Sequence, residues 1–226
     1  MENCKYIVIL GHSQNINTWA IIESILDTLD LPREIYFNGK TNLTKLSCKK
    51  LSSEDFENPK NSDSTQVYFI AAERHLAEQV HQLYHWHQKY HFEISSVISI
   101  LDRSFFKTNC PNLRDAMAHF SDLLLIDNTL PIPFEQLKTY TAHCKKKECY
   151  PLAIQTLTKP DVSAVRELYD SRPRRMTLIF DDIDPIDFID ESSVGQAPFT
   201  IPTLDQCDKY LKQDEQGRYL LPIESL

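Results

Sequence analysis

Short apolar runs alternate with segments whose apolar residues recur at helical spacing, over roughly the first three quarters of the chain. The runs are rich in Val, Ile, Leu, Tyr and Phe and are bounded by Gly, Pro, Asn and other polar residues, as buried strands are. We expect strands at residues 6–10, 34–37, 66–71, 96–101, 123–126 and 151–154, and helices at 18–29, 74–90, 112–120, 133–144 and 162–169. Strands that alternate with helices indicate βαβ units, a parallel sheet and right-handed crossovers. The predicted fold is a three-layer α/β/α domain with a mainly parallel sheet of about six to seven strands.

The pattern changes near residue 176. Residues 176–180 are apolar enough to form one more strand, and residues 181–191 then mix acidic with apolar side chains. Beyond them proline recurs and periodicity is lost. We therefore predict an α/β domain at residues 1–175 and an acidic C-terminal tail at residues 176–226. The tail would wrap the domain or bind a partner, and its cations for self-docking would be Arg172, Arg174 and Arg175.

Composition removes several classes of function. The formal net charge of −8 disfavours nucleic-acid binding, which needs a clustered excess of Lys and Arg. No run of about 18 apolar residues occurs, so we expect no membrane-spanning helix. The six cysteines form no C-x-x-C pair, which favours reduced thiols and a cytoplasmic protein.

The loop after the first predicted strand lies where open parallel sheets bind ligands, and the helix that follows it would begin near Asn17 or Thr18. The phosphate-binding pattern is G-x-x-x-x-G-K-S/T, and the matching stretch here is Gly11-His-Ser-Gln-Asn-Ile-Asn-Thr18. Ile16 replaces the second glycine and Asn17 replaces the lysine. A β-branched residue resists the torsions of the loop, and asparagine supplies no charge to the phosphates. The residues equivalent to the phosphate loop are Gly11, His12, Ser13, Asn15, Asn17 and Thr18.

In its order of elements the chain resembles the GTPase domain of CobW-type metallochaperones, relatives of the nickel-insertion GTPases, over residues 5–158. Residues 97–102 (VISILD), a helix, and residues 120–126 (FSDLLLI) are similar to that family's strand ending in V-D-A, its helix, and its A-D-x-x-L-L-N-K-x-D segment. Residues 43–50 fall where the family carries a G-C-x-C-C metal motif. The resemblance implies a P-loop NTPase-like fold and, where the motifs are complete, GTP and Mg²⁺ as ligands.

This chain departs from the family at each of its functional motifs. Asp127 and Asn128 stand at the start of the N-K-x-D motif, and Leu130 stands in place of its base-reading aspartate. Of the metal motif only Cys48 remains, and one thiolate cannot complete a four-ligand zinc site. Glu73 is the candidate substitute for the acidic switch residue, with Asp102 as a second residue beside the loop.

Histidines offer a separate metal hypothesis. His81 and His85 are spaced i, i+4 on the helix at 74–90, so their imidazoles share one face. Gln82 follows His81, so the H-E-x-x-H motif is absent. A solvated helix face is the simpler interpretation, and the sequence assigns no metal.

These observations predict a degenerate CobW-like GTPase-fold protein, a pseudo-GTPase that acts as a protein-binding or regulatory module without hydrolysing nucleotide. We assign no catalytic residue and no cofactor; GTP and Mg²⁺ would bind only if the altered loop still holds them. The partner would be another protein or a second copy in a homodimer. The first alternative is an enzyme that binds a nucleotide or another anion with the atypical loop, and the second is a metal-binding, metallochaperone-like protein.

Overall fold

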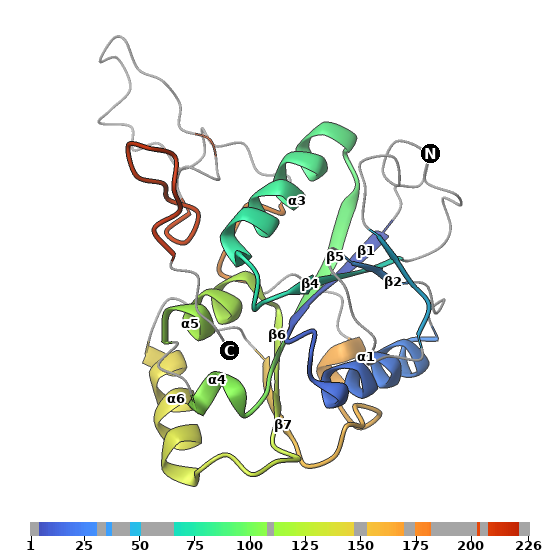
Figure 1. Ribbon diagram of the computed structural model, residues 1–226. Helices are drawn as coiled ribbons and strands as arrows, with labels where there is room; N and C mark the ends of the chain where they lie inside the picture. The colour runs from blue at the N-terminus through green and yellow to red at the C-terminus, as the bar shows by residue number, and fades with distance from the viewer. Residues whose placement is uncertain are drawn as a thin grey trace.

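A computed structural model of the chain describes residues 5–30, 35–37, 46–50, 66–107, 111–146, 153–169, 175–181, 203 and 208–221. Within these ranges the polypeptide forms one seven-stranded sheet with helices on both of its faces (Figure 1). No helix in this part of the chain is both long and apolar enough to cross a bilayer.

The sheet is parallel at every strand pair that the structure describes. Its order is β3-β2-β4-β1-β5-β6-β7, so β1 lies at the centre between β4 and β5. The strands are β1 (Lys5–Gly11), β2 (Ile35–Phe37), β3 (Cys48–Lys50), β4 (Gln66–Ala71), β5 (Glu93–Leu101), β6 (Leu123–Asp127) and β7 (Ala153–Leu157). The predicted α/β fold with a parallel sheet is thereby confirmed.

The helices form the two outer layers. They are α1 (Ile16–Thr28), α3 (Leu76–Tyr90), α4 (Ser104–Lys107), α5 (Pro111–Phe120) and α6 (Phe134–Lys146), followed by a short 3-10 helix over Arg166–Tyr169. Helices α3, α4, α5 and α6 share one apolar cluster with the first face of the sheet. Helix α1 and the segment around Val162 and Val165 share the cluster on the other face. Figure 1 shows α1 on the opposite side of the sheet from α3 and α5.

Alternate residues of the central strand supply the two clusters. Tyr6, Val8 and Leu10 point to the α3 side, whereas Ile7 and Ile9 point to the α1 side, and all five are buried. A parallel strand with helices on both faces needs apolar residues at every position, because neither side of it meets water. This explains why the run at residues 6–10 shows no alternation of apolar and polar residues.

Several predicted elements differ from the structure. Strand β7 (Ala153–Leu157) extends beyond the predicted end at residue 154, and residues 151 and 152 lie outside the described residues. The helix expected over 162–169 is reduced to the 3-10 turn. Residues 176–180 form no strand; they are turns and bends, in which Ile179 and Phe180 are buried against the α3 side of the core. Strand β3 and helix α4 were not predicted.

The described part of the tail packs on the domain. Leu211 and Leu221 join the apolar cluster on the α3 side, and Asp208 is buried beside His119. Asp181 pairs with Arg175, one of the cations proposed for self-docking, at 2.7 Å. Arg172, Arg174 and residues 182–191 lie outside the described residues. The division at residue 176 stays a prediction.

Candidate functional site

The candidate site lies at the carboxyl ends of the central strands. The chain turns from β1 into α1, passes to β2 on one side of the sheet, and returns from β4 through α3 to β5 on the other side. This reversal of direction brings the loops after β1 and β4 together, and ligands of open α/β sheets bind at such a switch point. The residues that directly follow β1, β4, β5 and β6 are therefore the candidates for this site.

Local hydrogen bonds close the loop after β1. Asn15 caps α1, because its Oδ1 accepts from the backbone N–H of Asn17 at 2.8 Å. The carbonyl of Ser13 accepts from Nε1 of Trp19, also at 2.8 Å. The helix thus begins at Ile16, one residue before Asn17, and its cap is a residue whose side chain can turn back over the first N–H groups.

Glu73, which follows β4, is hydrogen-bonded to the loop after β1. Its two carboxylate oxygens each accept from the backbone N–H of Ser13 at 3.1 Å, and one of them also accepts from the Ser13 hydroxyl. Ser13 is buried and Glu73 partly buried. A backbone N–H and a hydroxyl of this loop are the kind of donor that holds an anion in a phosphate site. Here the anion is a carboxylate of the same chain.

Asp102, at the end of β5, is the centre of a second group of contacts. It lies 3.4 Å from Nδ1 of His12, accepts from the Asn15 side-chain amide, and accepts from the backbone N–H and hydroxyl of Ser104. Burial alone would raise the pKa of Asp102, but the hydrogen bonds from His12, Ser104 and Asn15 outweigh it and hold the pKa below its ordinary value.

The pKa of His12 is shifted in the opposite direction, upward. The hydrogen bond with Asp102 raises the pKa of His12 although burial opposes the shift, and the charges of Asp102 and Glu73 raise it further. The imidazole is therefore protonated to a higher pH than an isolated histidine would be. The carboxylates of Asp102 and Glu73 thus both favour the protonated form of His12.

A third group of contacts ties the loop to the end of β6. Nδ2 of Asn17 donates to Oγ1 of Thr129 at 2.8 Å, and that hydroxyl donates to Oδ1 of Asp127 at 2.6 Å. The backbone N–H of Thr129 donates to the same Asp127 oxygen at 3.0 Å. Asn128 accepts from the N–H of Ile132 at 2.7 Å. Both residues of the expected base site thus have their side chains engaged in the turn after β6.

Thr18 does not face this network through its hydroxyl. The residue is fully buried, and its Oγ1 has no hydrogen-bond partner among the described residues. Its methyl group packs against Gly11, since a Cβ built on Gly11 would lie 3.0 Å from Thr18 Cγ2. Ile16, in contrast, is 63% exposed. Trp19 is buried and packs on Phe37 and Phe69.

The polar groups of this loop that would meet a nucleotide phosphate are engaged within the chain or buried. The N–H and hydroxyl of Ser13 bind Glu73, the amide of Asn17 binds Thr129, and the Thr18 hydroxyl that would meet Mg²⁺ is buried. The carboxylates of Glu73, Asp102 and Asp127 would repel a phosphate, since like charges at close range are unfavourable. The arrangement is chemically suited to holding four loops in one fixed geometry.

The candidate metal ligands lie elsewhere and apart. Cys48 is in β3, and burial raises the pKa of its thiol, which disfavours the thiolate that metals bind. His81 and His85 stack with ring centroids 4.4 Å apart, and Nδ1 of His81 lies 2.6 Å from the Tyr219 hydroxyl. Within the described residues no group of three or more His, Cys, Asp or Glu side chains could hold a metal ion.

The structure brings most of the residues named from the sequence to one place, and their role as a site stays a prediction. The structure brings together His12, Ser13, Asn15, Asn17, Glu73, Asp102 and Asp127 from four separate loops. Ser104 and Thr129 were missed. Each is a hydroxyl residue two positions after an aspartate at a strand end, and such Asp-x-Ser/Thr spacing is the signature of an Asx turn.

Comparisons with known proteins add two similar folds. No protein-family model matches the chain, and no curated protein sequence matches it at a significant level. The Zn(II)-bound YjiA GTPase from E. coli aligns with 77% of this chain and 67% of its own at 10% identity and a TM-score of 0.48. A Zn(II)-bound triple mutant of YjiA GTPase aligns with 80% of this chain and 69% of its own at 9% identity and a TM-score of 0.45. The fold assigned above rests on the strand order of the chain itself.

Proposed function

We propose that this protein is a degenerate, CobW-like pseudo-GTPase that binds another protein and does not hydrolyse nucleotide. One observation carries the proposal: the carboxylate of Glu73 is bound to the N–H and hydroxyl of Ser13, in the loop that would otherwise receive a phosphate. An internal carboxylate competes with any external anion for these donors at no cost in translational entropy. The loop also lacks the lysine that would favour the external anion.

Exposed apolar residues favour a protein partner at the same end of the domain. The described residues include five large apolar side chains that are clearly exposed: Ile16, Leu130, Phe134, Met176 and Leu220. Ile16 is the first residue of α1, Leu130 lies in the loop after β6, and Phe134 is the first residue of α6. The Asn17–Thr129 hydrogen bond holds the start of α1 against the loop after β6. Apolar residues gathered on a fixed surface are typical of protein interaction sites.

Isothermal titration calorimetry with GTP, GDP and ATP in the presence of Mg²⁺ tests the loss of nucleotide binding. We expect no saturable heat with the wild-type protein at ligand concentrations up to the millimolar range. Glu73→Gln is the informative variant, because the amide keeps the size of the side chain and removes its charge. Micromolar binding by the wild type, with turnover that disappears in Thr18→Ala, would overturn the proposal.

The protein-binding part needs its own test. Affinity enrichment is compared between the wild type, Ile16→Glu, Leu130→Glu and, as a control, Leu220→Glu, which alters an exposed leucine in the tail. We expect the wild type and the Leu220→Glu control to retain a partner, which is another protein or a second copy of this chain. Ile16→Glu and Leu130→Glu should both lose it. Equal retention by all four proteins would remove the surface from consideration.

The second candidate is an enzyme that binds another anion with this loop. The raised pKa of His12 favours it, since a protonated imidazole places a positive charge in the loop where the lysine is missing. Titration with inorganic phosphate and with sulfate, below and above neutral pH, distinguishes the two. Binding that requires low pH and is lost in His12→Gln would favour the enzyme. The metal-delivery alternative is decided by metal analysis of untagged protein.

A further inference from the structure

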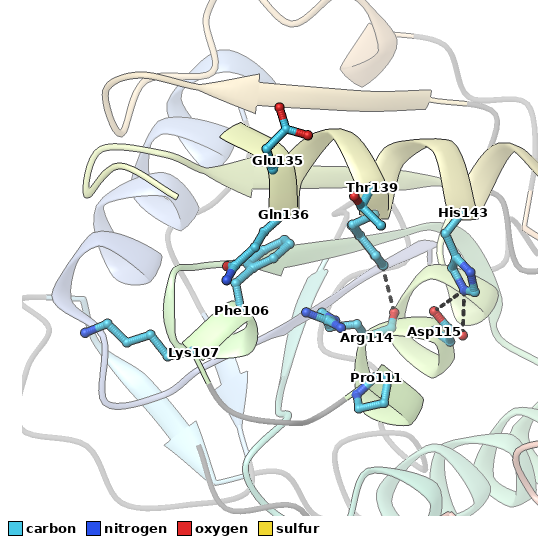
Figure 2. A pocket seen from close by; sticks show the side chains of 10 residues that line it. Phe106, Lys107, Pro111, Arg114, Asp115, Glu135, Gln136, Thr139 and His143 are labelled. Atoms are coloured by element: carbon cyan, nitrogen blue, oxygen red, sulfur yellow. Dashed lines mark hydrogen bonds and ion pairs between the residues drawn. The ribbon is translucent and has the colours of Figure 1, made fainter. Parts of the chain in front are cut away.

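A cavity of about 580 Å³ opens between α4, α5 and α6, on the flank of the domain (Figure 2). Its volume lies within the range of about 300–1,000 Å³ that small-molecule sites occupy. None of its lining residues belongs to the loop network at the carboxyl ends of the strands. The cavity therefore has to be explained separately, and an inference about it does not depend on the proposed function.

The cavity is built around the side chain of Arg114. The guanidinium carbon lies 5.2 Å from the centre of the Phe106 ring and 5.3 Å from that of the Tyr140 ring. The two rings meet edge to face at 5.5 Å, and both are buried. The Tyr140 hydroxyl donates to the Arg114 carbonyl at 3.1 Å, which fixes α6 against α5. The cation is thus held in place by aromatic faces and by the backbone.

Most of the hydrogen-bonding capacity of Arg114 is unused within the described chain. A guanidinium has five N–H donors in a rigid fork. Nη1 donates to the carbonyl of Phe105 at 3.1 Å, and Nε is buried with no hydrogen-bond partner. Among the described residues, two aromatic faces and one carbonyl offset the lost hydration of this cation, and no carboxylate does. The observed geometry therefore leaves room for an anion.

The nearest acidic side chain is already paired. Both carboxylate oxygens of Asp115 lie 2.9–3.0 Å from Nε2 of His143, on the far side of the cavity from Phe106. Figure 2 shows the dashed contacts of this pair, and it shows Glu135 at the rim with its carboxylate turned away from Arg114. The guanidinium therefore faces the cavity without a carboxylate from any described residue.

We propose that this cavity binds a small monocarboxylate that carries an aromatic or aliphatic body. The planar fork of arginine matches a carboxylate in size and geometry. The rings of Phe106 and Tyr140 would receive the apolar body of the ligand. A singly charged ligand suits the site better than a phosphate dianion, because Asp115 and Glu135 also line the cavity.

Calorimetry and two-dimensional NMR with a matched pair of probes test this proposal. The probes are N-acetyl-phenylalaninate and N-acetyl-phenylalaninamide, which differ only in the carboxylate. We expect the carboxylate to bind the wild type at least tenfold more tightly than the amide, with shift changes in the backbone amides of Phe106, Arg114 and Tyr140. Equal affinity for the two probes, or no saturable change with either, would refute the proposal.

Variants then assign the recognition to Arg114. Arg114→Gln should reduce affinity for the carboxylate at least tenfold, and Arg114→Lys should lower it less, since lysine keeps the charge without the fork. Lys138→Gln is the control, because Lys138 lies on α6 over the Phe134 ring and does not line the cavity. Unchanged affinity in Arg114→Gln contradicts the assignment. If that variant fails to fold, Arg114→Lys and the probe pair on the wild type still decide the matter.

Discussion

The carboxylate of Asp208 lies 2.8 Å from Nε2 of His119, so a residue of the C-terminal segment is buried against helix α5, although 89 positions separate the two. Asp208 also accepts from the Thr177 hydroxyl at 2.6 Å and from the backbone N–H of Tyr210 at 2.9 Å. Burial alone would raise the pKa of Asp208, but these contacts outweigh it and lower the pKa. The carboxylate is thus held ionised in a buried position.

Removal of this carboxylate should destabilise the whole domain. Asp208→Ala leaves His119 and Thr177 without their partner, and we expect a loss of about 3 kcal/mol in the free energy of unfolding. Urea denaturation measures it. The control is Glu215→Ala, which alters an exposed acidic residue of the same segment and should have little effect. Equal stability of the two variants would mean that the tail contact contributes nothing to the fold.

Arg175 should be as important to the stability of the domain. Its side chain is 1% exposed and donates to Asp122 at 2.8 Å and to Asp181 at 2.7 Å. Arg175→Met strands a buried carboxylate, so we expect a loss of about 3 to 5 kcal/mol. Arg218→Met is the control, since Arg218 is paired with Asp214 but its side chain is 72% exposed. Thermal and urea unfolding should separate the two variants clearly.

The His12–Asp102 pair should make stability depend on pH in a defined window. The pKa of His12 is raised above 6.5, so its contribution is complete below pH 6.5 and is lost as pH rises through the folded-state pKa. The pKa of Asp102 is lowered below 3.8, so its contribution is present above pH 3.8 and is lost as pH falls through the folded-state pKa. Both contributions are therefore complete between pH 3.8 and 6.5.

Asp102→Asn tests this window. The difference in unfolding free energy between wild type and variant should be largest between these two pH values and shrink on either side. An NMR titration of the His12 ring protons should give a pKa above 6.5 in the wild type and a lower one in the variant. A His12 pKa that does not respond to the substitution would show that the two side chains are not coupled.

Gly11 is constrained by its neighbours rather than by its backbone torsions. A Cβ at this position would lie 3.0 Å from Thr18 Cγ2 and 3.3 Å from Phe69 Cε2. Gly11→Ala should therefore cost about 1 to 3 kcal/mol through overpacking. Thr18→Ser removes the closest atom, so the double variant should recover part of the loss. A double-mutant cycle measures this recovery, and strictly additive effects would contradict the contact.

The Thr18→Val variant tests whether the Thr18 hydroxyl contributes to stability. Valine keeps the shape of threonine and removes a buried hydroxyl that has no partner among the described residues. We expect unchanged stability or a gain of up to about 1 kcal/mol, because no hydrogen bond is lost. A loss greater than 1 kcal/mol in urea denaturation would show that the hydroxyl is bonded in solution.

The sequence predicts the interior of the sheet better than its edge. Residues 6–10 and 123–126 are continuous apolar runs, and both form buried strands where expected. Strand β3 is only Cys48–Lys50, and its Lys side chains give no apolar signal. The α4 helix is a single turn, too short for any periodicity. Residues 176–180 were predicted to form a strand because they are apolar. In the structure Ile179 and Phe180 are buried in the apolar cluster on the α3 side without forming a strand.

At the candidate site, the sequence predicts the position of the loop but not the contacts that the loop makes. The pattern around Gly11 and Thr18 located the loop, and strand order then placed Asp102 and Glu73 beside it. The Ser13–Glu73 contact joins residues 60 positions apart. Composition and spacing carry no information on such a contact, because it depends on which side of β1 the β4 strand lies. The cavity around Arg114 was likewise invisible, since its aromatic partners come from two other helices.

The central position of β1 has a consequence for synthesis on the ribosome. Its partners pair in the registers Tyr6–Gln66 and Leu10–Ser99, so both edges of the first strand await residues made much later. At about 5–20 residues per second, that delay is roughly 3 to 18 seconds. During that delay the apolar residues 6–10 have two open edges, which is the condition under which strands pair with other chains. Nascent chains of this protein should therefore depend on chaperones that shield the amino-terminal strand until β4 and β5 emerge.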